Sequence, residues 1–124
     1  MAKFMNKLSV TPFNTNSINP KALIATAQVS IDDPARHVNV LGKHFASKVE
    51  VKLMQHSTLI IFEEGSCNMI PHQSQIEFHC HADNRDDMTA ITDTIDRHIN
   101  AFFRKSNIDI DWQVQNNQAR QGFR

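Results

Sequence analysis

Residues 75–102 read QIEFHCHADNRDDMTAITDTIDRHINAF, and this stretch joins a strand pattern to a helix pattern. From Gln75 to Ala82 apolar and polar residues alternate, as expected for a strand with one buried face. Asp83 or Asn84 can then cap a helix, which we expect Asn107 to end. Apolar residues recur at spacings of three or four on one face of that helix. They are Met88, Ile91, Ile95, Ile99 and Phe102.

The preceding part of the chain contains the same two patterns. A first strand is predicted over residues 21–31, where β-formers are frequent. A side-chain cap from Asp32 or Asp33, with Pro34 in the first turn, predicts a helix that ends near Lys48. Further strands are predicted over 49–54, 57–64, 66–70 and 75–82, and a last strand over 108–114. The short connections favour an antiparallel meander.

The resulting order, β-α-β-β-β-β-α-β, predicts an α+β fold in which two helices pack on one face of a curved antiparallel sheet. This order is similar to one repeat of the TATA-box-binding-protein-like fold, a likeness that predicts no function by itself. We expect a flexible N-terminal arm over residues 1–20, one domain over 21–114 and a polar tail over 115–124.

Composition narrows the function classes. Thirteen basic and thirteen acidic residues give a formal net charge of zero, which argues against a nucleic-acid partner. No apolar stretch is long enough to span a membrane. Cys67 and Cys80 form no C-x-x-C pair and no dense disulfide pattern, so we expect a reduced, cytoplasmic protein. The three glycines form no phosphate-binding loop.

Two of the seven histidines flank the apolar stripes of the predicted helices. His44 precedes Phe45 in the first helix, and His98 precedes Ile99 in the second. If both helices cover one sheet face, the two imidazoles can approach each other, and paired neutral imidazoles are common metal ligands. The alternative for each ring is a half-buried histidine bonded to a backbone carbonyl.

Three other candidates have ordinary explanations. His79 and His81 lie on the outward face of the predicted strand 75–82, where a His-x-His pair can chelate a metal, although such faces are usually just polar. Cys80 is expected on the apolar face as a small buried side chain. Cys67, which follows Gly65 in EEGSC, is expected to be a buried, inert thiol.

Several segments together resemble a bacterial family, the domain of unknown function 2218. They are KHFASK, EEGSC, RHINAFFRK and IDIDWQ, and the resemblance runs from Val29 to Gln113. It implies a compact cytoplasmic α+β domain with no established catalytic role. It also implies a loose association with iron uptake and siderophores. The residues that fit the family pattern are His44, Phe45, Lys48, Gly65, Cys67, His98, Phe102, Arg104 and Trp112.

These observations lead to three functional hypotheses. The first is a non-catalytic binding protein that handles iron, haem or a siderophore. The second is an enzyme in which His98 or His44 is a general base near Cys67 or Glu63. The third is an interaction module that uses an open sheet face, and an exposed sheet edge could also pair two chains as a homodimer. The candidate ligand-binding residues are His44, His98, Cys67 and Trp112, with His44 and His98 as metal ligands.

Overall fold

The computed structural model describes residues 23–103 and 108–116. Along the chain the elements are β1 (Leu23–Ser30), α2 (Pro34–Ala46), β2 (Glu50–Leu53), β3 (Thr58–Ile61), β4 (Gly65–Pro71), β5 (Gln75–Ala82), α3 (Arg85–Phe102) and β6 (Gln113–Asn116). The predicted order of strands and helices is therefore confirmed. The expected arm over residues 1–20 and most of the expected tail lie outside the described residues.

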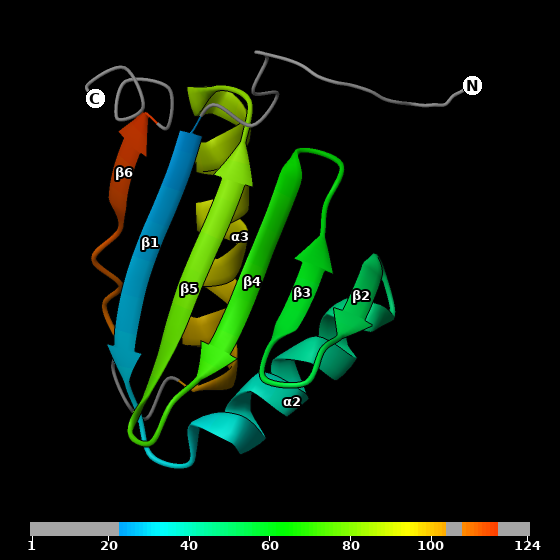
Figure 1. Cartoon of the computed structure of the whole chain (residues 1–124), viewed down its shortest axis with the longest axis vertical. Coiled ribbons are helices and arrows are strands. Elements are labelled where there is room, and N and C mark those ends of the chain that lie inside the picture. The colour runs from blue at the N-terminus through cyan, green and yellow to red at the C-terminus, as the bar shows by residue number, and fades with distance from the viewer. Residues whose placement is uncertain (1–22, 104–107, 117–124) are drawn as a thin grey trace.

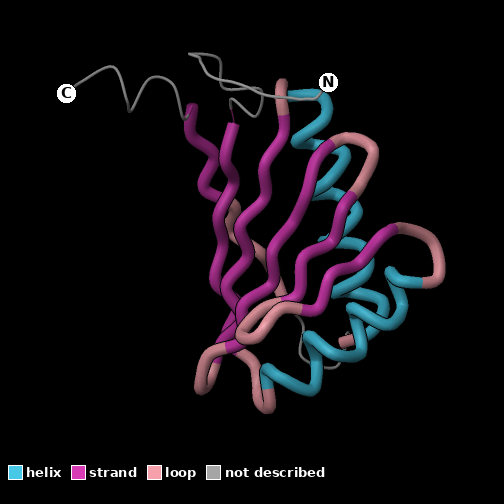
Figure 2. The backbone as a smooth tube through the Cα atoms, turned by 45° about the vertical axis from the view of Figure 1, so that its right-hand side comes forward, coloured by secondary structure: helices cyan, strands magenta, loops and turns pink. Residues whose placement is uncertain are grey.

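The strands form one six-stranded sheet in the order β2-β3-β4-β5-β1-β6, and every neighbouring pair is antiparallel. Both helices lie on the same face of this sheet (Figures 1 and 2). The predicted α+β architecture is thus confirmed. We call the other face, which no described element covers, the open face.

The core lies between the sheet and the two helices. In β5 the side chains at 76, 78, 80 and 82 are buried, as the alternation predicted. In α3 the predicted stripe is buried from Met88 to Ile99, and α2 buries Val38, Leu41 and Phe45 at the same kind of spacing. Burying each large apolar side chain contributes about 1.5–3 kcal/mol to stability, so this core holds the helices on the sheet. None of the helices in the described residues is long and apolar enough to cross a membrane.

The two helices begin differently. Asn84 caps α3, because its side-chain oxygen accepts a hydrogen bond from the Asp87 backbone N–H at 2.9 Å. The expected side-chain cap of α2 is wrong. Asp33 has a left-handed backbone (φ 54°) and makes no side-chain cap. Its carbonyl oxygen instead lies 3.3 Å from the His37 backbone nitrogen and 2.9 Å from His37 Nδ1.

Two predictions near the C-terminal end are also wrong. Phe102 is 42% exposed and does not continue the buried stripe, because α3 ends there and its ring packs on the His44 imidazole at the seam between the helices. The last strand is not 108–114. Ile108, Ile110 and Trp112 pack against the core as irregular chain, and β6 begins only at Gln113, where pairing with β1 starts.

Candidate metal-binding site between the two helices

The structure brings His44 and His98 together. His44 lies in the last turn of α2, and His98 lies near the C-terminal end of α3. Their ring centres are 4.9 Å apart and the ring planes are inclined by 54°. Both side chains are half-buried. The contact arises because each histidine precedes a core residue, Phe45 or Ile99, on two helices that share one sheet face.

Phenylalanine rings surround the pair. Phe45, which is buried, lies 4.6 Å from the His98 ring. Phe102 lies edge-on at 4.9 Å from the His44 ring and nearly parallel to His98 at 6.4 Å. Phe62 packs edge-on against Phe45. These rings exclude water from part of the pair, which strengthens any electrostatic interaction at its nitrogens.

One hydrogen bond fixes the proton on His98. Its Nδ1 lies 2.7 Å from the Thr94 carbonyl oxygen, which can only accept. Nδ1 is therefore the donor, and in the neutral ring the lone pair lies on Nε2. Metal-binding histidines are held in this way, with one nitrogen donating to a carbonyl and the other binding the ion.

The His44 imidazole makes no hydrogen bond within the part of the chain that the structure describes, although the His44 backbone carbonyl oxygen accepts from Ser47. Burial lowers the pKa of His44, and the electrostatic influence of His98 and then of Lys48 lowers it further. The His44 ring is therefore neutral at neutral pH, which is the form that binds metals.

The spacing of the rings fits a shared ion. A metal ion about 2.0–2.1 Å from one nitrogen of each ring lies roughly 3 Å from each ring centre. Two ring centres that are 4.9 Å apart then subtend an angle of roughly 100° at the ion. That angle is close to tetrahedral. No third ligand completes the site, since no group of three or more His, Cys, Asp or Glu side chains among residues 23–103 and 108–116 could hold a metal.

The other two candidates lie apart from the histidine pair. Cys67 is fully buried opposite Cys80, and both thiols are free. The pKa of Cys67 is raised well above its usual value, first by the hydrogen bond with Cys80 and then by burial. A sealed, protonated thiol is neither a nucleophile nor a metal ligand. Trp112 donates its Nε1–H to Asp96 at 3.0 Å and packs on Phe78, so it pins the segment before β6 to α3.

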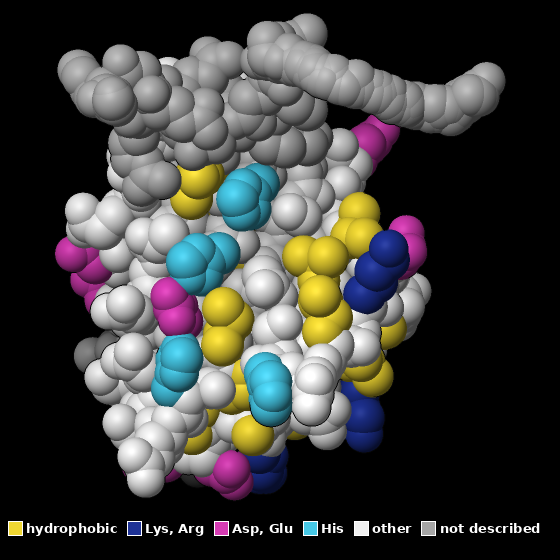
Figure 3. Space-filling view, in the orientation of Figure 1, with side chains coloured by type: hydrophobic (Ala, Val, Ile, Leu, Met, Phe, Trp, Pro, Cys, Tyr) yellow, Lys and Arg dark blue, Asp and Glu magenta, His cyan; other side chains and the backbone are white. Residues whose placement is uncertain are grey.

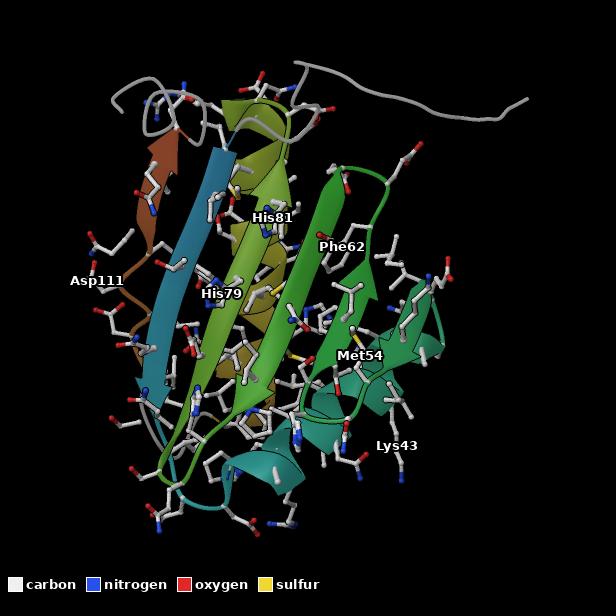
Figure 4. All side chains as sticks on the ribbon, in the orientation of Figure 1. Lys43, Met54, Phe62, His79, His81 and Asp111 are labelled. Carbon is white, nitrogen blue, oxygen red and sulfur yellow. The ribbon has the colours of Figure 1, made fainter. Side chains whose placement is uncertain are left out.

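On the open face, where the sequence predicted His79 and His81, the structure adds a carboxylate bridge that was not predicted. The Glu77 carboxylate lies 2.7 Å from His72 Nε2 and 2.6 Å from His79 Nε2. Both bonds lower the pKa of Glu77. Burial, followed by the charge of His79, lowers the pKa of His81. Figure 3 shows histidines spread over this face, and Figure 4 shows His79 and His81 projecting from β5.

The alternation of residues 75–82 predicted which side chains face outward, but the carboxylate bridge depends on the turn between β4 and β5. That turn returns His72 to the neighbourhood of Glu77, and His72 N–H donates to the Gln75 carbonyl oxygen at 2.8 Å. The short turn between the two predicted strands was the sequence feature from which this contact between His72 and Glu77 could have been predicted.

Comparisons with known proteins agree with this architecture. Residues 26–113 match a family described as an uncharacterised protein conserved in bacteria, the domain of unknown function 2218. No curated protein matches the chain. The NMR structure of PA4090 from Pseudomonas aeruginosa is similar in fold, with a TM-score of 0.64 and 24% sequence identity, over 73% of this chain and 95% of that one. The family match covers most of the described fold, both histidines of the pair included, and the chain belongs to the bacterial family of domain of unknown function 2218.

Proposed function

We propose that this chain binds a divalent transition-metal ion between His44 and His98 and leaves the remaining coordination positions to water or a small chelating ligand. One observation carries the proposal: two imidazoles from different helices lie 4.9 Å apart, and Thr94 holds one of them with its Nε2 lone pair free. Two protein ligands with open positions suit temporary binding or transfer of a metal, because structural zinc sites are closed by four ligands.

The chemistry of the donors limits the ion. Imidazole nitrogen suits zinc, copper, nickel and iron better than magnesium or calcium. Iron, as a free ion or in a small chelate, is one of these metals. Haem clamped between the rings is a poorer fit, since metal–nitrogen distances of about 2 Å on opposite sides of the iron place the ring centres roughly 6 Å apart, more than the observed 4.9 Å.

The proposal is tested by titrating the full chain with Zn²⁺ and Ni²⁺ in a calorimeter. We expect His44→Ala and His98→Ala each to weaken binding roughly tenfold or more, because each removes one ligand of a two-ligand site. His79→Ala is the matched control, since it removes one imidazole of the His-x-His pair on the open face and leaves the helices unchanged. Equal binding by all four proteins, or loss only in His79→Ala, would move the site away from the helices.

The pH dependence of binding gives an independent check. Protons compete with the metal for the same nitrogens, so affinity falls as pH drops through the pKa of the ligands. Because the pKa of His44 is lowered, its ring stays available somewhat below the usual imidazole range. Titrations across this range should therefore show an affinity that falls as pH drops, because protons compete with the metal at its ligands.

A further inference from the structure

The β2 strand forms one edge of the sheet. It is bonded to β3 on one side, and no described element lies on its other side (Figure 1). Leu53 is 78% exposed at this edge, and Met54, which follows it, is 55% exposed. Natural proteins usually block such an edge, since its unpaired backbone groups can bind another strand.

The hairpin between β2 and β3 shows which backbone groups are unpaired. The Met54 N–H donates to the Ser57 carbonyl oxygen at 2.9 Å, so these two residues form a hydrogen-bonded pair. Bonded and non-bonded pairs alternate in an antiparallel ladder. Lys52 and Glu50 therefore bond to β3, and the backbone N–H and C=O of Val51 point out of the edge.

The neighbours of Val51 follow the same alternation. Leu53 also presents its N–H and C=O outward. Val49 presents only its carbonyl, because its N–H donates to the Phe45 carbonyl oxygen at 2.9 Å. The edge thus offers a short, regular set of donors and acceptors.

Side chains along β2 divide by face. Glu50 pairs with Ile61 and Lys52 pairs with Leu59, all on the open face. The side chains at 49, 51 and 53 are apolar and lie toward the helix face. Figure 3 shows a basic and an acidic side chain close together over this edge, beside hydrophobic ones.

We propose that two copies of this chain pair antiparallel through β2, about a twofold axis at Val51. This register places Glu50 of each copy opposite Lys52 of the other, on the same face. It places Leu53 opposite Val49 on the helix face, and Val51 opposite its own equivalent. A symmetric dimer needs such a self-complementary patch.

The backbone fits the same register. Each Val51 would donate to and accept from the other Val51, and each Leu53 N–H would donate to the Val49 carbonyl of the other copy. The Val49 N–H, which Phe45 already uses, is left out of this ladder. Opposite charges directly across an antiparallel pair stabilise it, and like charges destabilise it.

The charge pairs supply the test, by sedimentation of the full chain at several concentrations. We expect the wild type to dimerise and Glu50→Lys or Lys52→Glu to weaken the dimer roughly tenfold or more, since each change places like charges opposite one another in two pairs. Mixing the two single variants should restore a dimer, because each then meets the opposite charge. The double variant E50K/K52E should dimerise by itself.

Both residues are exposed, so at a concentration where the wild type is monomeric, thermal melts of the variants should match the wild type and exclude misfolding. If a single variant fails to fold, the double variant still tests the pairing. A wild type that stays monomeric at all concentrations overturns the proposal. So does a dimer that both single changes leave intact, or single variants that remain monomers when mixed.

Discussion

Replacing Gly65 with alanine should destabilise the protein strongly. Gly65 is the first residue of β4 and pairs with Ala82 of β5. A Cβ at this position would lie 2.0 Å from the His81 carbonyl oxygen and 2.9 Å from Ile91 Cδ1. The isoleucine methyl can move, but the carbonyl belongs to the β5 backbone. The φ angle of Gly65 is not positive, so its backbone conformation does not require glycine. Glycine is needed here because the two strands approach closely.

Relief of this clash requires the two strands to separate locally. Overpacking of this kind costs 1–3 kcal/mol and occasionally more, and because the obstacle is backbone we expect about 3 kcal/mol. Gly42→Ala is the matched control. Its Cβ would lie 3.2 Å from Thr58 Cγ2, and alanine favours a helix interior by about 0.5–1 kcal/mol, so its net effect should be small.

Urea denaturation measures both variants. With an m-value of about 1–3 kcal/mol/M, a loss of about 3 kcal/mol lowers the midpoint by roughly 1–3 M at constant m. Gly42→Ala should shift the midpoint little. Equal midpoints for the two variants would refute the close approach of β4 and β5 at this residue.

Three further predictions test other contacts. Phe102→Ala should cost about 1 kcal/mol in urea unfolding, below the ~3–5 kcal/mol of a buried phenylalanine, because the ring is 42% exposed; a cost in the higher range would contradict its position at the helix seam. Trp112→Phe should cost about 0.5–1.5 kcal/mol through the lost bond to Asp96, and Asp96→Asn should cost less in the same measurement. The lowered pKa of Glu77 predicts a contribution to stability that is present above the usual carboxyl pKa and is lost as pH falls through the folded pKa. Thermal melts from about pH 7 downward should therefore show a steeper loss of stability in the wild type than in Glu77→Gln. Parallel curves would exclude the bonds between Glu77 and the imidazoles.

Much of the fold followed from periodicity, because both helices and the strands β1, β3, β4 and β5 bury one face. The strand at 75–82 has the predicted bounds, since its alternation is regular and turn residues flank it. The segment 108–112 alternates equally well but is not a strand. Its apolar side chains pack on the core while its backbone remains unpaired with β1, and sequence patterns report side-chain burial alone.

The histidine pair shows the same limit. His44 and His98 lie beside apolar stripes of two helices on one side of the sheet, and this was sufficient to predict that the two rings could meet. The tautomer of His98 depends on the Thr94 carbonyl, four residues earlier in the same helix, and the phenylalanine rings around the pair depend on tertiary packing. Phe102 was assigned to the core because a spacing of three from Ile99 does not reveal where a helix leaves the sheet.

The most direct test of the metal site is a long-range ¹H–¹⁵N NMR spectrum of the imidazole rings, recorded with and without Zn²⁺. This spectrum identifies the protonated and the metal-bound nitrogen of each histidine. The account predicts Nδ1–H for His98 before zinc is added, followed by zinc-dependent shifts at Nε2 of His98 and at one nitrogen of His44. Shifts confined to His79 and His81, or unchanged rings at saturating zinc, would contradict it.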